Sequence, residues 1–227
     1  MGALVLACGK DAGHGASPMF ADRDDLEVHE VAAKPGRTEV DPLVKGLDGR
    51  RLLVRGTDAD LAAVVLRLLR TERLAEVPVG YLPTSEDSVV ARIWDLPTDP
   101  GRALDLALRA DPDPVPLIRD DSGGVIVGEG VFRPVRGVAY CDETQVLRGQ
   151  AGQLTVGPDP DRGPGLVVRV VRRQLLVRRT TVTQGRAVQV GCVPSAPVSD
   201  GVVHPRQVTK WTWYRHTEDL RLVRGLI

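Results

Sequence analysis

Asp58 is the residue whose position most suggests chemistry. It lies in the stretch 51–61, where an apolar run, Leu52–Val54, ends at Gly56 and a helical pattern of apolar residues follows. This order predicts a strand, a turn and a helix, with an acid at the turn. Ligands of open α/β sheets bind at the carboxyl ends of strands, and the first amides of a helix attract anions. The turn is therefore a candidate phosphate site, and Asp58 would face it.

Asp58 also has a structural interpretation. An aspartate directly before a helix is a common N-cap, because its carboxylate accepts hydrogen bonds from the first free amides. The helix predicted here begins near Leu61. Capping and catalysis are compatible, so the residues alone leave both roles open.

A glycine-rich loop follows the first predicted strand, Ala3–Cys8. Gly13 and Gly15 in this loop would let backbone amides approach an anion closely. The loop is neither a Walker A sequence nor a GxGxxG fingerprint. A surface loop of this composition is an equally good interpretation.

Strand and helix patterns alternate through the first half of the chain. Strands are predicted at 3–8, 26–31, 52–54 and 78–82, and helices at 41–46, 61–70, from Ser85 or Asp87 to about 94, and from 98–101 to about 108. This alternation indicates a mostly parallel sheet with helices on its faces. The first predicted domain is 1–114, with 220–227 as a candidate returning strand.

From Val115 onward the pattern changes to short apolar runs separated by Gly, Pro and Arg-rich turns. No helical pattern stands out, so residues 115–219 are predicted to form an antiparallel sheet or sandwich. Trp211 and Trp213 share one face of a strand, which indicates a core or interface position.

Charge is balanced overall, with 30 Lys and Arg against 30 Asp and Glu, but it is unevenly distributed. From residue 165 to the end there are 11 basic and 3 acidic residues. Arginines on solvent-facing strands would explain this, and so would attraction to anionic lipid headgroups. Nucleic acid is not expected, because few aromatic residues are available for base stacking and no binding motif is present.

Cysteine and histidine show no metal-ligand spacing. Cys8, Cys141 and Cys192 are isolated and odd in number, which predicts neither a disulfide framework nor a zinc site. The apolar opening is too short for a signal peptide, and no run approaches the ~20 apolar residues that span a bilayer. The expected location is the cytoplasm, with peripheral binding at the inner membrane face as a further expectation.

The order of these parts resembles the catalytic domain of the diacylglycerol kinase family, which is related to NAD kinases and sphingosine kinases. The resemblance extends over nearly the whole chain. The family's Gly-Gly-Asp-Gly-Thr is similar to residues 56–60, which keep the first Gly and the Asp. Its Asn-Pro-x-x-Gly-x-Gly loop corresponds to Cys8–Gly15, which lacks the Asn-Pro.

Two later motifs are also partly kept. The family's Pro-x-Gly-Thr-Gly-Asn-Asp-Phe-Ala-Arg resembles Tyr81–Arg92, where Thr84, Asp87 and Arg92 match if two residues are inserted. Both glycines and the Asn of that motif are missing. The family's Asp-Gly-Glu is similar to residues 200–202, where Asp200 and the glycine are kept and a valine replaces the Glu.

The resemblance implies a Rossmann-like lobe followed by a β-sandwich lobe, and ATP-dependent, Mg²⁺-assisted phosphoryl transfer to a lipid hydroxyl. Asp58 would be the catalytic acid and Asp200 a metal ligand. The residues implied to contact the nucleotide are Gly13, Gly15, Gly56, Thr57, Thr84, Ser85 and Asp87.

The alternative is a catalytically inactive relative that binds a nucleotide, a lipid or a protein. Thr57 and Ala59 carry Cβ atoms where a phosphate would approach the backbone, and Val202 cannot bind a proton or a metal. The partners considered are a nucleotide, an anionic lipid or membrane surface at the Arg-rich second lobe, and a second copy of the chain in a homodimer.

Overall fold

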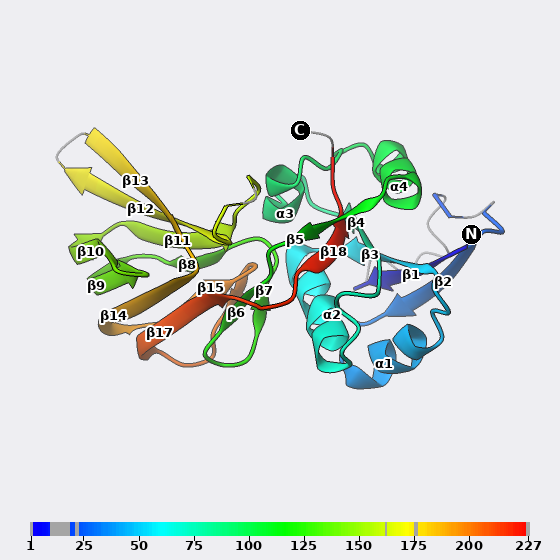
Figure 1. The fold of residues 1–227 in the computed structure, drawn as a ribbon, viewed down its shortest axis with the longest axis horizontal. Coiled ribbons are helices and arrows are strands. Elements are labelled where there is room, and N and C mark those ends of the chain that lie inside the picture. The colour runs from blue at the N-terminus through cyan, green and yellow to red at the C-terminus, as the bar shows by residue number, and fades with distance from the viewer. Residues whose placement is uncertain (1, 10–18, 21–22, 162, 175–176, 226–227) are drawn as a thin grey trace. The chain divides into compact units, whose positions relative to one another are not determined.

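Two compact units make up the chain, residues 1–115 with 218–227, and residues 116–217. The computed structural model describes residues 2–9, 19–20, 23–161, 163–174 and 177–225 (Figure 1). The first unit is an α/β structure and the second consists of antiparallel strands. The predicted fold class is therefore confirmed.

The first unit is built on one six-stranded sheet of order β2-β1-β3-β4-β18-β5. Neighbouring strands are parallel throughout, except that β5 is antiparallel to β18. The strands are β1 (Ala3–Cys8), β2 (Leu26–Val31), β3 (Arg51–Gly56), β4 (Val79–Pro83), β5 (Pro112–Val115) and β18 (Leu220–Val223). The helices are α1 (Arg37–Lys45), α2 (Asp58–Arg70), α3 (Val89–Ile93) and α4 (Pro100–Arg109). The last strand thus returns to the first unit.

The alternation of side chains along β3 sends successive residues to opposite faces of the sheet. Leu53 joins Val5 and Leu82 in a cluster packed on α4. Helices α1 and α2 cover the other face (Figure 1). Arg55 follows Leu53 by two residues, so it shares the α4 face.

Helix α4 is held close to the sheet by two residues. A Cβ atom on Gly80 would lie 2.8 Å from the Cβ of Ala107, so only glycine allows this approach. Arg51 donates hydrogen bonds from Nη1 to the carbonyls of Ala107 and Ala110, at 3.0 and 2.5 Å, at the end of α4. Because these contacts fix α4, its first turn lies beside the carboxyl ends of β3 and β4.

The second unit contains two six-stranded antiparallel sheets of order β10-β9-β14-β17-β6-β7 and β13-β12-β11-β8-β15-β16. Its strands are β6 (Ile118–Asp120), β7 (Val125–Ile126), β8 (Gly130–Phe132), β9 (Val135–Cys141), β10 (Thr144–Ala151), β11 (Gln153–Pro158), β12 (Leu166–Gln174), β13 (Val177–Gly185), β14 (Ala187–Ser195), β15 (Val198–Ser199), β16 (Val202–Val203) and β17 (Val208–Arg215).

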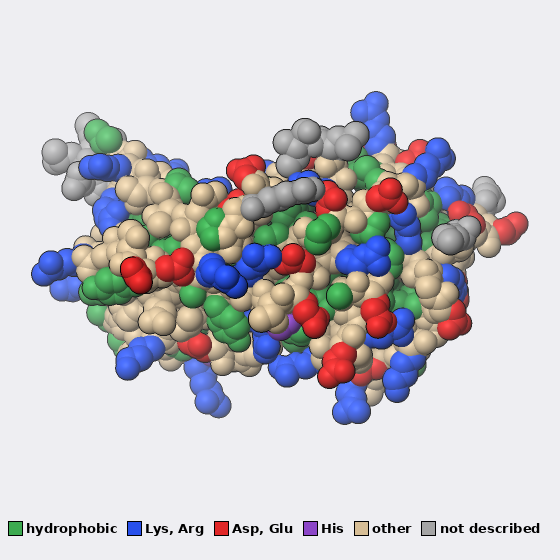
Figure 2. All heavy atoms as spheres, viewed as in Figure 1, with side chains coloured by type: hydrophobic (Ala, Val, Ile, Leu, Met, Phe, Trp, Pro, Cys, Tyr) green, Lys and Arg blue, Asp and Glu red, His purple; other side chains and the backbone are tan. Residues whose placement is uncertain are grey.

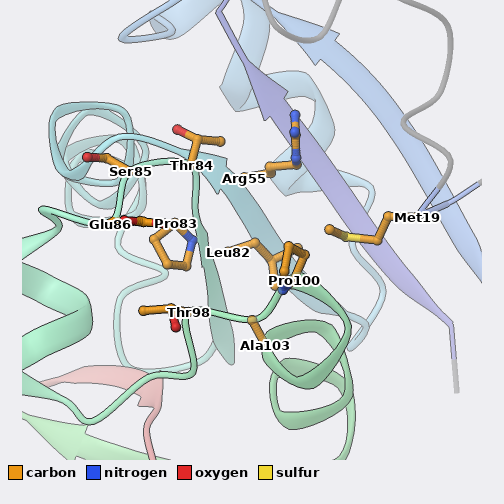
Figure 3. A pocket seen from close by; sticks show the side chains of 10 residues that line it. All are labelled: Met19, Arg55, Leu82, Pro83, Thr84, Ser85, Glu86, Thr98, Pro100 and Ala103. Atoms are coloured by element: carbon orange, nitrogen blue, oxygen red, sulfur yellow. The ribbon is translucent and has the colours of Figure 1, made fainter.

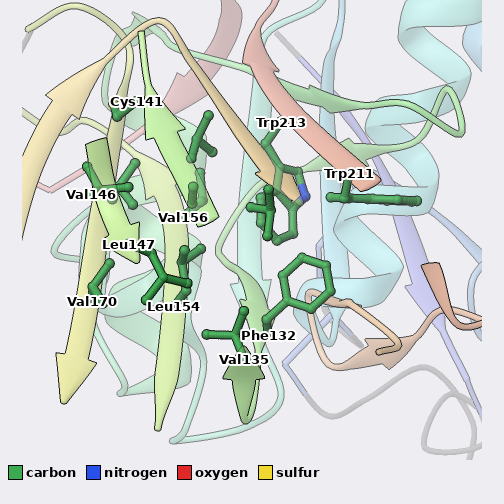
Figure 4. Close-up of a cluster of buried hydrophobic side chains, with 14 of the residues drawn as sticks. Phe132, Val135, Cys141, Val146, Leu147, Leu154, Val156, Val170, Trp211 and Trp213 are labelled. Atoms are coloured by element: carbon green, nitrogen blue, oxygen red, sulfur yellow. The ribbon is translucent and has the colours of Figure 1, made fainter. Parts of the chain in front are cut away.

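Both sheets of the second unit contribute to one apolar core (Figure 4). Trp213 is fully buried there, and its ring packs edge-on against Phe132 with centroids 5.4 Å apart. Trp211 lies beside it at 6.3 Å. The shared strand face of the two tryptophans therefore turns inward.

Several element boundaries differ from those expected from sequence. Helix α2 begins at Asp58, three residues before Leu61, because Thr57 is its N-cap. Helix α3 begins only after Ser88, which is its N-cap in place of Ser85 or Asp87. Residues 112–115, for which the sequence predicted no strand, form the edge strand β5, where proline is tolerated because one side of the strand needs no partner.

Within the described residues, no helix is both long enough and apolar enough to cross a membrane.

Candidate functional site

The turn between β3 and α2 is closed by a reciprocal cap. The amide of Asp60 donates to Thr57 Oγ1 at 3.3 Å, while Asp60 Oδ2 accepts from the amide and the hydroxyl of Thr57, both at 2.8 Å. Asp60 Oδ1 accepts a further bond from the amide of Lys34 at 2.6 Å. The carboxylate of Asp60 therefore joins the turn to the connection between β2 and α1.

Gly56 faces this carboxylate directly. A Cβ atom at Gly56 would lie 2.7 Å from Asp60 Oδ2, so the glycine makes room for the side chain of Asp60. Asp60 is 3% exposed, which means that its charge is held inside the turn. A phosphate on this side of Gly56 would meet a buried negative charge. The turn is thus occupied by an anion of the chain itself.

Asp58 precedes Asp60 by two residues in the chain. Its carboxylate accepts hydrogen bonds from four donors. Its Oδ1 accepts from the hydroxyls of Tyr81 and Ser88, at 2.9 and 2.5 Å. Its Oδ2 accepts from the amides of Val89 and Val90, at 2.7 and 3.2 Å. Asp58 therefore accepts from the first two amides of α3, beside the N-cap Ser88. One of the two roles left open by the sequence was a cap on the helix containing Leu61 instead.

The hydrogen bonds of Asp58 bear on catalysis. A carboxylate has about four lone-pair sites, and each oxygen of Asp58 already accepts two bonds. A general base needs a free lone pair within reach of the proton that it removes. Burial and the nearby charge of Asp58 raise the pKa of Tyr81 above its ordinary value, so the tyrosine remains a neutral donor. The hydrogen bonds of Asp58 therefore suit a structural role, in which its carboxylate holds the start of α3 against the start of α2.

A cavity of about 380 Å³ lies at the carboxyl ends of β3 and β4, beside the start of α4 (Figure 3). Such a volume is within the usual range for small-molecule sites. In Figure 3, Leu82 and Pro100 lie near the centre, with Arg55 and Thr84 above them and Thr98 below. The lining residues are Met19, Arg55, Leu82, Pro83, Thr84, Ser85, Glu86, Thr98, Pro100 and Ala103.

The lining of this cavity is divided by chemistry. Apolar side chains such as Met19 and Leu82 form one part, and the hydroxyls of Thr84, Ser85 and Thr98 form another. Arg55 supplies a cation and forms no ion pair with any described residue. A ligand with a flat apolar portion and an anionic group would match this division.

The residues expected to bind a nucleotide are only partly brought together. Thr84 and Ser85 line the cavity, whereas Gly56 and Thr57 form the closed turn and Asp87 is exposed without lining the cavity. Gly13 and Gly15 lie outside the described residues.

Asp200, the expected metal ligand, belongs to the second unit and is 7% exposed. Its carboxylate accepts from the amides of Val127, Gly128 and Glu129, at 3.0, 2.8 and 2.9 Å. Among the described residues, no group of three or more His, Cys, Asp or Glu side chains could hold a metal ion. Both oxygens of Asp200 therefore accept backbone amides instead of belonging to an acidic cluster, whereas Mg²⁺ at nucleotide sites is held by one or two carboxylates together with phosphate oxygens and water.

The sequence interpretation assigned no role to two residues of the candidate site, Arg55 and Asp60. Arg55 could have been noticed as a charged residue ending an apolar strand, two positions after Leu53 and hence on the same face. Asp60 could have been recognised as the partner of Thr57 in a capping box, since it follows the threonine by three residues. Both signals are local.

Comparisons with known protein structures identify the fold. No family model and no curated protein matches the sequence. The structure is similar to a diacylglycerol kinase from Bacillus anthracis strain Sterne, at 12% identity and a TM-score of 0.70, covering 98% of this chain and 97% of that one. It is also similar to an NAD kinase from Archaeoglobus fulgidus solved in complex with ATP, at 12% identity and a TM-score of 0.61, covering 99% and 94%. The chain therefore has the two-unit fold of diacylglycerol kinase and NAD kinase structures.

Proposed function

We propose that this chain binds a nucleoside phosphate, such as ATP, in the cavity at the carboxyl ends of β3 and β4, without transferring its phosphoryl group. The observation that carries the proposal is the cavity itself, with Arg55 on its wall and no ion-pair partner for Arg55 among the described residues. Ligands of open α/β sheets bind at this edge of the sheet.

The lining supports a specific orientation of the ligand. Met19, Leu82 and Pro100 offer an apolar surface for a base, while Arg55 offers a guanidinium group for a phosphate. Glu86 can accept hydrogen bonds from ribose hydroxyls. The similar NAD kinase structure contains ATP, which makes ATP the first ligand to test.

Binding without transfer is favoured by the two acids of the β3–α2 turn. Asp58 uses both carboxylate oxygens to hold α3, Tyr81 and Ser88, and Asp60 places a buried charge against Gly56. Phosphoryl transfer relies on positioning and on neutralising charge around the phosphates. A lipid kinase, which the resemblance implies, would need Asp58 to release these donors and a Mg²⁺ site to form.

The test is calorimetric titration of ATP, with and without Mg²⁺, into the wild type and into Arg55→Gln. We expect saturable binding that does not require Mg²⁺ and about 10- to 30-fold weaker binding by Arg55→Gln, since a charged hydrogen bond is lost. Arg109→Gln is the matched control, because Arg109 has a 79% exposed side chain, forms an ion pair with Asp105 alone among the described residues and does not line the cavity. Thermal melting verifies that both variants are folded.

Two results would contradict the proposal. Absence of binding at millimolar ATP would show that this chain does not bind ATP. Mg²⁺-dependent ADP release with diacylglycerol vesicles, abolished in Asp58→Asn while ATP binding persists, would show that the chain is a lipid kinase.

A further inference from the structure

The β12–β13 hairpin concentrates positive charge. Residues 166–185 contain five arginines and neither lysine, aspartate nor glutamate. Strand pairing places Arg172 opposite Arg179, and Arg173 opposite Arg178. Directly opposite residues share a face of the hairpin, so Arg172 and Arg179 form a pair of like charges on one face. Such pairs destabilise a hairpin unless an anion lies against them.

Within the described part of the chain, no acid pairs with four of these arginines. Among the described residues, none of the ion pairs involves Arg169, Arg172, Arg178 or Arg179. Arg172 donates instead to the carbonyl of Val146 at 2.9 Å. Figure 2 shows Lys and Arg side chains around this end of the second unit. The positive charge of the hairpin is therefore available to an external partner.

Apolar side chains accompany the arginines. Val177, the first residue of β13, is 66% exposed, and Val182 on the same strand is 58% exposed. The hairpin contains no Phe, Trp or Tyr that could stack on a base. Arginine next to exposed aliphatic side chains matches a surface with anionic headgroups over a hydrocarbon layer.

Protection of a sheet edge is the structural alternative. β13 is the last strand of its sheet, and charged side chains on edge strands prevent pairing with other molecules. One charge of either sign on the outer strand would serve that purpose. Edge protection does not explain arginines facing arginines on both strands or the exposed valines beside them.

We propose that the end of the β12–β13 hairpin at Arg172, Val177, Arg178 and Arg179 docks on an anionic lipid membrane. The guanidinium groups bind headgroup phosphates, and the Val177 side chain enters the layer beneath them. This surface belongs to the second unit and does not depend on the nucleotide proposed for the first.

Vesicle flotation tests the proposal, using vesicles of phosphatidylcholine alone and vesicles with equal parts of phosphatidylglycerol. We expect binding only to the anionic vesicles, and weaker binding as salt is raised. Arg178→Glu with Arg179→Glu should reduce the partition coefficient at least about 30-fold, since each arginine near the surface contributes about fivefold. The matched control is Arg136→Glu with Arg148→Glu, which makes the same charge change at exposed positions on β9 and β10.

Val177→Asn separates lipid insertion from simple charge attraction. We expect about fivefold weaker partitioning that persists at high salt, because the apolar contribution is not screened. Thermal melting should show all three variants folded, since the changed side chains are exposed.

Four outcomes would overturn all or part of the proposal. The first is no binding to anionic vesicles. The second is an equal loss in the β9 and β10 control, which would reduce the effect to net charge. The third is binding to a single-stranded oligonucleotide in preference to vesicles, which would assign the hairpin to nucleic acid. An unchanged partition coefficient for Val177→Asn would overturn the insertion of the valine.

Discussion

The carboxylates of Asp58 and Asp200 differ from the guanidinium groups of Arg178 and Arg179 in how their charge is balanced. Each carboxylate accepts at least two backbone hydrogen bonds and joins segments that are far apart in sequence. The arginines have no ion-pair partner in the part of the chain that the structure describes. Charges balanced internally stabilise the fold, whereas charges left unbalanced are free to bind something else.

The largest expected effect is that of Asp200→Ala. Three amides in the loop before β8 would lose their acceptor, and the site is nearly inaccessible to water. We expect a loss of about 4 kcal/mol in the free energy of unfolding of the second unit. Urea titration followed by Trp211 and Trp213 fluorescence measures it.

Glu143→Ala, at an exposed residue of the same unit, is the control for Asp200→Ala and should change stability by less than about 0.5 kcal/mol. Equal stability of Asp200→Ala and the wild type would mean that the carboxylate is not a structural tie.

Asp58→Ala should have the next largest effect. The variant leaves two amides at the start of α3 and the hydroxyl of Ser88 without an acceptor, while the Tyr81 hydroxyl keeps the carbonyl of Gly56 at 3.0 Å. Water also reaches this half-buried site more easily. We expect a loss of about 3 kcal/mol. Trp94 ends α3 and is 2% exposed, so its fluorescence reports the change.

Asp87→Ala is the matched control for Asp58→Ala, because Asp87 is an exposed acid just before the same helix. If the two variants were equally stable, Asp58 would be available for catalysis and the kinase interpretation would gain support.

Asp41 is intermediate between the carboxylates that accept backbone amides and the arginines that have no ion-pair partner. Its carboxylate accepts hydrogen bonds from the side chain of Arg67. Arg67 donates to both carboxylate oxygens at 2.8 Å, and this hydrogen bonding lowers the pKa of Asp41 below its ordinary value of 3.8. A lowered pKa contributes stability above the unfolded value, and this contribution is lost as the pH falls through the folded one. Asp41→Asn should therefore cost about 1 kcal/mol at neutral pH and progressively less below about pH 4.

Denaturant titrations across this pH range measure the difference for Asp41→Asn, with Asp24→Asn at an exposed acid as the control. A difference that stayed constant from neutral to acid pH would show that the ion pair does not account for it.

The amino-acid sequence by itself determined the local elements of this protein. The apolar run 3–8 and the alternating pattern 26–31 predicted β1 and β2, and the change of pattern near Val115 indicated the two kinds of unit. These features depend on residues close together in the chain, because side-chain spacing and turn residues act over a few positions. The overall order of parts was sufficient to recognise the fold that the structural comparisons confirm.

Only the tertiary structure decided what the candidate site residues do. Asp58 is the first residue of α2, yet its carboxylate accepts from the first amides of α3, some thirty positions away. Gly56 has the same identity as a phosphate-binding glycine, yet the Asp60 carboxylate occupies the space beside it. A carboxylate binds whichever donors folding brings within about 3 Å, and chain order does not specify those donors. Residue types therefore named the candidates, and packing between distant segments assigned their contacts.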